Sequence, residues 1–251
     1  FRMPGSSLSI SGPNFMLNTA VAESLRQFAD ILEKEDDFST GVDKLLRNTL
    51  KKHARIIFND DNYSDEWVKE AKRRGLLNLA STPEALPYFI ADKNIKLFET
   101  HGILTRDEVV SRYEIMLENY SKVINIEALT MLEMARQDII PAVCEYIKLL
   151  SDETAAKKLV CASVNCSMEE NLISALSDKL SALFENLEEL DKEVHTAHNM
   201  SGAQKAAEYY HDTVLARMEK VRGIADYMEV YTAKEYWPFP TYGDLLFSIQ
   251  E

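Results

Sequence analysis

The sequence predicts an all-α protein, a bundle of long up-and-down helices that follows a short strand or loop. Three observations support this fold class. Glycine and proline number only 8 and 7 among 251 residues, which is few for a protein with many turns. Apolar residues recur every three or four positions along most of the chain, the period of an amphipathic helix. From Leu172 to Val194 this spacing tightens almost to a heptad, as in helices that pack side by side.

The first third of the sequence predicts one irregular segment and three helices. Residues 1–13 are rich in Ser, Gly and Pro, which indicates a strand end and a loop. Asn14 is a suitable N-cap for a helix that extends to about residue 32. A second helix is expected at about 39–59. After a polar loop, a short third helix is expected at 64–75, where a glycine ends it.

The middle of the sequence contains two strong helix starts. Residues 81–84 (Ser-Thr-Pro-Glu) place a proline in the first turn, where its missing N–H costs nothing. Pro87 soon interrupts, so we expect a kink or two short helices before Gly102. Residues 105–108 (Thr-Arg-Asp-Glu) form a capping-box pattern that opens a very long helix. Pro141 is expected to bend that helix about one turn from its end.

The last third of the sequence predicts an antiparallel helix pair and an apolar tail. The heptad-like helix ends at a Ser-Gly turn at 201–202, and a last long helix carries apolar residues from 214 to 228. Long helices joined by so short a loop lie antiparallel. The tail at 236–243 (Tyr-Trp-Pro-Phe-Pro-Thr-Tyr-Gly) is expected to be non-helical. Its apolar side chains must pack on the bundle or dock on another domain or subunit.

Composition excludes several classes of partner. Lys and Arg number 28 against 41 Asp and Glu, a net charge of −13, which argues against binding nucleic acid. No apolar run is long enough to span a membrane, so no membrane partner is expected. The three cysteines, Cys144, Cys161 and Cys166, show no metal-ligand spacing and indicate free thiols in a reducing cytoplasm.

Few residues suggest chemistry by spacing alone. His195 and His198 could share a helix face, and Glu208 with His211 has the spacing of a carboxylate-bridged metal site in a bundle. Such a site needs two of these pairs, and the chain has one, so we interpret these side chains as solvated and predict no metal ligands. Basic clusters at 51–53 and 72–74 lie near expected helix C-termini, which the helix dipole favours.

A family resemblance rests on three stretches of the sequence. They are Phe-Arg-Met-Pro-Gly-Ser-Ser at 1–7 with Gly-Pro-Asn at 12–14; Ser-Thr-Pro-Glu-Ala-Leu at 81–86 with His-Gly-Ile-Leu-Thr at 101–105 and Ser-Arg-Tyr-Glu at 111–114; and Ile-Glu-Ala-Leu-Thr-Met at 126–131 with Tyr-Trp-Pro-Phe-Pro-Thr-Tyr-Gly-Asp-Leu-Leu-Phe at 236–247. Together they resemble the C-terminal portion of type III glutamine synthetases. The third stretch resembles that branch specifically.

The resemblance implies an ATP-dependent ligase that joins ammonia to glutamate through γ-glutamyl phosphate, with Mg or Mn ions, in cytoplasmic nitrogen metabolism and glutamine biosynthesis. Arg2 matches the arginine of the family's Glu-x-Arg-x-Pro segment and is the expected catalytic and substrate-binding residue. That segment's metal-binding glutamate would precede Phe1. The resemblance therefore implies that this portion binds no cofactor and is inactive alone. Tyr63 lies where some relatives are adenylylated, but its surroundings do not resemble the modified loop.

The resemblance also implies a domain organisation for the chain. We expect the end of a catalytic-barrel strand at 1–13, a helical part of the catalytic domain at 14–104, a supporting bundle at 105–235 and the tail at 236–251. In the family such chains form homo-oligomers, and we expect a dodecamer of two hexameric rings. The alternatives are a non-catalytic helical module for protein interaction and a ferritin-like metal enzyme.

Overall fold

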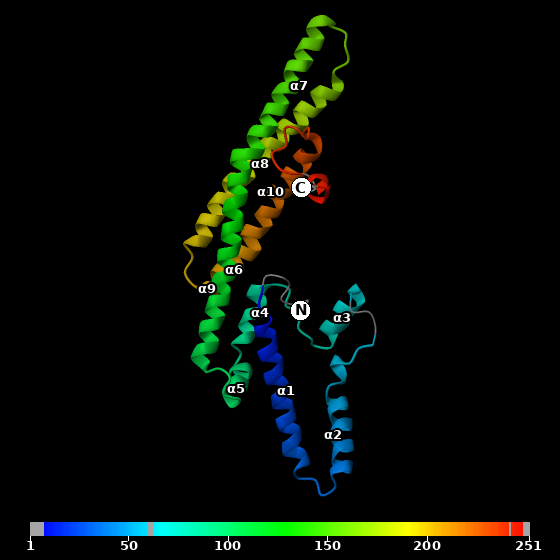
Figure 1. Ribbon diagram of the computed structural model, residues 1–251, viewed down its shortest axis with the longest axis vertical. Coiled ribbons are helices and arrows are strands. Elements are labelled where there is room, and N and C mark those ends of the chain that lie inside the picture. The colour runs from blue at the N-terminus through cyan, green and yellow to red at the C-terminus, as the bar shows by residue number, and fades with distance from the viewer. Residues whose placement is uncertain (1–7, 60–62, 241, 248–251) are drawn as a thin grey trace. The chain divides into compact units, whose positions relative to one another are not determined.

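The computed structural model describes residues 8–59, 63–240 and 242–247, and these residues are helical or irregular with no β-strand among them (Figure 1). The chain divides into two compact units, unit 1 at Phe1–Met116 and unit 2 at Leu117–Glu251. No helix in the described ranges combines the length and the apolar character needed to cross a membrane. The predicted all-α class is confirmed, whereas a strand at the start of the chain is not.

Unit 1 contains short and medium helices and the first part of a long one. The helices are α1 (Ser11–Leu32), α2 (Phe38–Lys52), a 3₁₀ turn at Ala54–Ile56, α3 (Asp65–Arg73), α4 (Thr82–Phe89), α5 (Asp92–Thr100) and the beginning of α6 (Arg106–Met134). A small apolar core joins α5 to its neighbours through Ile95, Phe98, Leu104 and Val109, with Phe15 and Met16 of α1 packed against it.

Two predicted boundaries in unit 1 are wrong. Helix α1 begins at Ser11, so Asn14 is not its cap; the Asn14 N–H donates to the Ile10 carbonyl at 3.1 Å inside the first turn. Pro13 allows this early start because the N–H groups of a first turn have no helical partner. Helix α2 ends at Lys52 rather than near residue 59, and its two terminal lysines favour that end through the helix dipole.

Other local signals in unit 1 are confirmed. Ser81 and Glu84 form a complete capping box, each accepting a hydrogen bond from the other's backbone N–H. Two short helices, α4 and α5, follow it as expected, although Pro87 lies inside α4 and the break comes at Ile90. Helix α3 ends at Arg73, and Gly75 follows it with a φ of +72°, a left-handed conformation that glycine adopts without strain.

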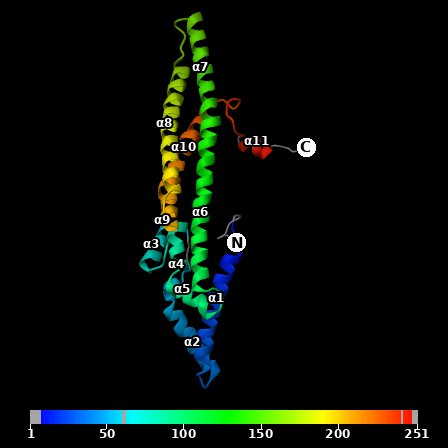
Figure 2. The ribbon, with the colours of Figure 1, turned by 90° about the vertical axis from the view of Figure 1, so that its left-hand side faces the viewer.

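Unit 2 is a bundle of long helices. It contains the rest of α6, a π-helical segment at Ala135–Ile139, α7 (Ile140–Val160), α8 (Ser167–His198), α9 (Ala203–Tyr209), a π-helical segment at Tyr210–Leu215, α10 (Ala216–Tyr231) and the short α11 (Tyr242–Phe247). Helix α8 packs against both α7 and α10, and short connections make these neighbours antiparallel (Figures 1 and 2). The predicted up-and-down arrangement is confirmed for this unit.

The core of unit 2 follows the heptad-like stripe predicted from the sequence. Its fully buried leucines on α8 are Leu176, Leu183, Leu187 and Leu190, each 0% exposed. Helix α10 contributes Val221 and Met228 to the same core. Alternating three- and four-residue steps keep these side chains on one face of a long helix, so α8 can pack against two neighbouring helices.

The prediction that the long helix ends about one turn after Pro141 is wrong. The Thr105–Glu108 capping box forms and opens α6 as predicted. Pro141, however, lies in the first turn of α7, and the helix continues from there to Val160. The π-helical segment immediately before Pro141 changes the hydrogen-bond register, so a residue without an N–H is accommodated there.

The apolar tail divides into two parts. Trp237 and Phe239 pack against the core of unit 2, while Leu246 and Phe247 of α11 are 75% and 81% exposed. The last part of the tail motif is helical, contrary to prediction, because α11 begins at Tyr242, after the second proline. An ion pair of 2.5 Å between Lys234 and Asp244 ties α11 to the chain before it.

Candidate functional site

The residue predicted to be catalytic lies outside the described part of the chain. Arg2 lies in the segment 1–7, which is not among the described residues, so the structure gives no position for the expected active-site arginine. Its assignment stays a prediction.

The histidine and glutamate pairs noted in the sequence do not converge. His195 lies 3.2 Å from the amide nitrogen of Asn199, and His211 lies 2.7 Å from the carboxylate of its neighbour Asp212. Glu208 accepts a hydrogen bond of 2.7 Å from Gln204 on its own helix. Across the described ranges, no group of three or more His, Cys, Asp or Glu side chains is placed to hold a metal ion. A ferritin-like site is therefore not supported by these residues.

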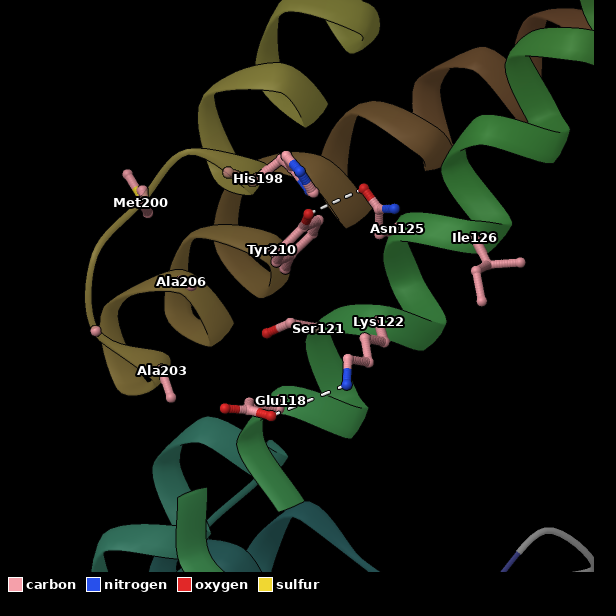
Figure 3. Close-up of a pocket in the computed structure, with 12 residues that line it drawn as sticks. Glu118, Ser121, Lys122, Asn125, Ile126, His198, Met200, Ala203, Ala206 and Tyr210 are labelled. Carbon is pink, nitrogen blue, oxygen red and sulfur yellow. Dashed lines mark hydrogen bonds and ion pairs between the residues drawn. The ribbon is translucent and has the colours of Figure 1, made fainter. Parts of the chain in front are cut away.

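A pocket of about 460 Å³ lies in unit 2 between α6 and the turn that joins α8 to α9 (Figure 3). Helix α6 forms one wall and the other elements form the opposite wall. The lining residues are Glu118, Ser121, Lys122, Asn125 and Ile126 from α6, and Ala197, His198, Met200, Gly202, Ala203, Ala206 and Tyr210 from the opposite wall. A pocket of this volume accommodates a small molecule.

One end of the pocket is closed by a hydrogen bond between distant parts of the sequence. The hydroxyl of Tyr210 donates to the side-chain oxygen of Asn125 at 3.0 Å. Burial raises the pKa of the Tyr210 phenol, so this group stays neutral and remains a donor at physiological pH. The bond fixes the Asn125 side chain and leaves its amide nitrogen as the group that can donate elsewhere.

Three further polar groups from α6 lie along the same pocket. Glu118 and Lys122 are one helical turn apart, and their charged atoms are separated by 3.9 Å, beyond hydrogen-bond distance. Between them in the sequence, Ser121 has a hydroxyl oxygen that is buried, and it has no hydrogen-bond partner among the described residues. Figure 3 shows this hydroxyl directed toward the space between α6 and α9. The arrangement offers one negative group, one positive group and an unused hydroxyl.

A larger apolar groove of about 990 Å³ runs between α6, α10 and the tail. Its lining includes the methionines, aromatic residues and leucine Met131, Met134, Met218, Trp237, Phe239 and Leu245. Charged side chains of α10, including Arg222 and Asp226, lie at its edge. Methionine and aromatic side chains that line a groove are typical of surfaces that contact apolar partners.

The sequence did not indicate the pocket beside α6. Asn125 and Tyr210 are 85 residues apart, and neither belongs to a short motif. The only local signal is the i, i+3, i+4 spacing of Glu118, Ser121 and Lys122, which occurs on many solvated helix faces. Only the packing of α6 against the α8–α9 turn distinguishes this face from others.

The chain is similar to known glutamine synthetases. Residues 41–158 match the family model of the glutamine synthetase C-terminal domain. Similar proteins include a glutamine synthetase of Butyrivibrio fibrisolvens, 42% identical over 86% of this chain and 31% of the relative. A type-3 glutamine synthetase of Dictyostelium discoideum is 34% identical over 98% of this chain and 35% of the relative. A glutamine synthetase of Bacteroides fragilis is 28% identical over 99% and 35%. The chain thus spans about a third of the length of these relatives.

Proposed function

This chain belongs to the glutamine synthetase family, and from that premise we propose that it is the C-terminal portion of a type-3 enzyme. The intact enzyme would ligate ammonia to glutamate with ATP, through γ-glutamyl phosphate. The observation that carries the proposal is the alignment of a type-3 glutamine synthetase with 98% of this chain. That relative is a type-3 glutamine synthetase, from which the proposed activity is taken. The exposed surfaces of this chain support its role as one part of such an enzyme.

The exposed face of α1 supports a role within a larger protein. Leu17, Val21 and Leu25 follow one another at helical spacing and are 58%, 57% and 60% exposed. Leu46 and Leu50 of α2 are also more than half exposed. A soluble protein rarely leaves so many large apolar side chains in water on neighbouring helices. These faces suit contact with the rest of an enzyme, including the barrel that the resemblance implies.

Arg2 is the residue proposed to act in catalysis. A guanidinium is planar and permanently charged, so it suits contact with a glutamate carboxylate and with a phosphoryl group in transfer. ATP with divalent ions supplies the phosphoryl group in such a reaction. We propose, from the family resemblance, that other parts of the enzyme hold the metal and nucleotide sites.

Unit 2 is proposed to support assembly. Its helices form a dry core of their own, while its tail and apolar groove remain open to a partner. We propose that these surfaces help to shape a cytoplasmic homo-oligomer, a dodecamer of two hexameric rings. The alternative, a helical module for protein interaction without a catalytic role, would use the same surfaces without Arg2.

The first test measures turnover in the intact enzyme that carries this chain. We expect Arg2→Ala to lower the rate of glutamine formation by roughly 100-fold or more while the oligomer stays intact. The matched control is Arg73→Ala, because the Arg73 side chain is 74% exposed and, among the described residues, pairs only with Glu70 on its own helix. Unchanged kinetics for Arg2→Ala would show that the assignment of Arg2 is wrong.

The second test removes the helical hairpin at 165–233 from the same enzyme. Loss of the oligomer, measured by light scattering, together with loss of glutamine formation, is the expected result. If the shortened enzyme kept both its assembly and its rate, the supporting role of unit 2 would be refuted. Retained assembly with lost activity would also contradict the proposal, because the hairpin would then act on catalysis and not on assembly.

A further inference from the structure

Two of the three cysteines lie at the same turn of unit 2. Cys161 directly follows the last residue of α7, and Cys166 directly precedes the first residue of α8. Figures 1 and 2 show this α7–α8 turn at the end of unit 2 opposite α9. Cys161 is exposed, whereas Cys166 is only 3% exposed, and both are free thiols. An accessible thiol and a protected one therefore share the short segment 161–166.

The packing of the two helix ends brings this pair of cysteines together. Lys157 in the last turn of α7 donates to Glu169 in the first turn of α8 at 2.6 Å, so the two helix ends lie side by side. The Val164 N–H donates to the Cys161 carbonyl at 3.0 Å, which folds the intervening chain into a tight turn. Closing a ring over so few residues costs little chain entropy. A disulfide within this turn is therefore favoured over one between two copies of the chain.

Cys161 has the surroundings of a reactive thiol. The Ser163 hydroxyl lies 3.4 Å from the Cys161 sulfur. Hydrogen bonds from this hydroxyl, and from the backbone N–H groups of Ser163 and Val164, lower the pKa of the Cys161 thiol below its ordinary value. The thiolate is the form that attacks oxidants, and an exposed thiolate needs no opening of the fold to do so. Cys144 is exposed as well, but it lies inside α7 and away from the turn.

We propose that residues 161–166 form a reversible oxidation site for hydroperoxides, with Cys161 as the attacking thiol and Cys166 as the resolving thiol. In the first step the Cys161 sulfur attacks one peroxide oxygen, the O–O bond breaks, and the leaving oxygen takes up the thiol proton. This step gives a sulfenic acid and, from hydrogen peroxide, one water molecule.

In the second step the Cys166 sulfur displaces the hydroxyl group of that sulfenic acid. A sulfur–sulfur bond forms, the S–O bond breaks, and the hydroxyl leaves with the Cys166 proton as a second water molecule. The two thiols are thus oxidised by two electrons, and the peroxide is reduced by two. A dithiol reductant restores both thiols by exchange with the disulfide. This inference concerns unit 2 alone and does not depend on the activity proposed above.

The test treats the reduced, full 251-residue chain with hydrogen peroxide, blocks the remaining thiols with iodoacetamide and analyses tryptic peptides by mass spectrometry. Trypsin cleaves after Lys and Arg, so Cys161 and Cys166 leave together on peptide 159–179, and Cys144 leaves on peptide 137–148. We expect peptide 159–179 to lose two hydrogen atoms and to carry no alkyl group. This change should occur about ten times faster than the oxidation of Cys144. Dithiothreitol should restore the doubly alkylated peptide.

Four variants separate the two roles. Cys166→Ser should leave the sulfenic acid of Cys161 unresolved, so that dimedone captures it, whereas Cys161→Ser should leave Cys166 as a thiol that iodoacetamide alkylates after unfolding. Ser163→Ala should slow the oxidation of Cys161 roughly threefold, because the thiolate loses a hydrogen bond. Cys144→Ser is the matched control and should form the disulfide at the rate of the unchanged chain. Circular dichroism checks the folding of each variant, and Cys166→Ala replaces Cys166→Ser if the latter unfolds.

The peptide mass of the unchanged chain decides the proposal without any variant. If peptide 159–179 never loses two hydrogen atoms, or if Cys144 is oxidised as fast as Cys161, the proposal is wrong. Pairs of chains cross-linked through Cys161 on a non-reducing gel, in place of the disulfide within the turn, would also overturn it. A Cys166→Ser variant that dimedone does not label would show that Cys161 is not the attacking thiol.

Discussion

Leu187 offers a direct measure of how much the bundle core stabilises unit 2. Its side chain is 0% exposed, in the middle of the leucine stripe of α8. Replacing it by alanine removes three carbon atoms from a dry core, a transfer cost of about 2.4 kcal/mol at about 0.8 kcal/mol per carbon group. The cavity left behind adds to this cost, because neighbouring helices collapse only in part. We therefore expect Leu187→Ala to lower the free energy of unfolding by about 3–4 kcal/mol.

The same substitution on the surface provides the control. Leu159 lies near the end of α7 and is 88% exposed. Leu159→Ala deletes the same three carbon atoms from a helix, but these atoms are already in water. It should change the free energy of unfolding by less than about 0.5 kcal/mol. The difference between the two variants then reports burial alone.

The two tryptophans allow the transition of unit 2 to be followed by itself. Trp67 lies in unit 1, stacked on Phe58 with ring centroids 3.8 Å apart, while Trp237 packs against the core of unit 2. In a Trp67→Phe background, tryptophan fluorescence during urea unfolding reports Trp237 only. If Leu187→Ala cost less than about 1 kcal/mol, or no more than Leu159→Ala, the assignment of Leu187 to a close-packed core would be refuted.

Two further predictions use the same fluorescence signal. Lys157 donates a hydrogen bond to Glu169 at 2.6 Å and holds the pKa of that carboxyl below its ordinary value of 4.5. The pair therefore stabilises the folded state above pH 4.5, and this stabilisation is lost as the pH falls through the lowered pKa. Glu169→Gln should therefore lower the urea midpoint at pH 7, and the difference should shrink below pH 4.5; a difference independent of pH would contradict this. Gly202 has a φ of +95°, so Gly202→Ala should cost about 1–2 kcal/mol, whereas Gly223→Ala, inside α10 with open space around it, should stabilise by about 0.5–1 kcal/mol. Equal effects of the two alanines would refute the argument from backbone conformation.

Local signals predicted helix starts well wherever a side chain itself makes the cap. Ser81 and Thr105 cap α4 and α6 as the sequence indicated, because a hydroxyl and a glutamate three residues later satisfy each other's backbone groups. The start of α1 was misplaced because no side chain caps it; Ile10 occupies that position. A residue suited to be a cap is therefore weaker evidence than a reciprocal pair.

Features that depend on packing between distant segments could not be predicted. The π-helical segment before Pro141 changes the hydrogen-bond register of a long helix, and nothing in the local sequence distinguishes it from an ordinary helix. The pocket beside α6 is a similar case. Two of its lining residues, Asn125 and Tyr210, meet across 85 residues of sequence, and periodicity says nothing about which helix faces meet. The proposed catalytic residue, in contrast, came from a family motif and lies outside the described residues.

Two apolar stripes with the same helical period differ in burial: one is buried and the other is exposed. The stripe of α8 is buried because α7 and α10 lie on both sides of it, whereas Leu17, Val21 and Leu25 of α1 remain more than half exposed. Helical spacing therefore specifies that a helix forms and which face is apolar, but the partner that covers the face must come from elsewhere. Unit 2 supplies that partner from its own sequence and is a bundle in its own right. Among the described residues of unit 1, no such partner covers the apolar face of α1. This exposed face is consistent with the proposal that unit 1 contacts other parts of a larger enzyme.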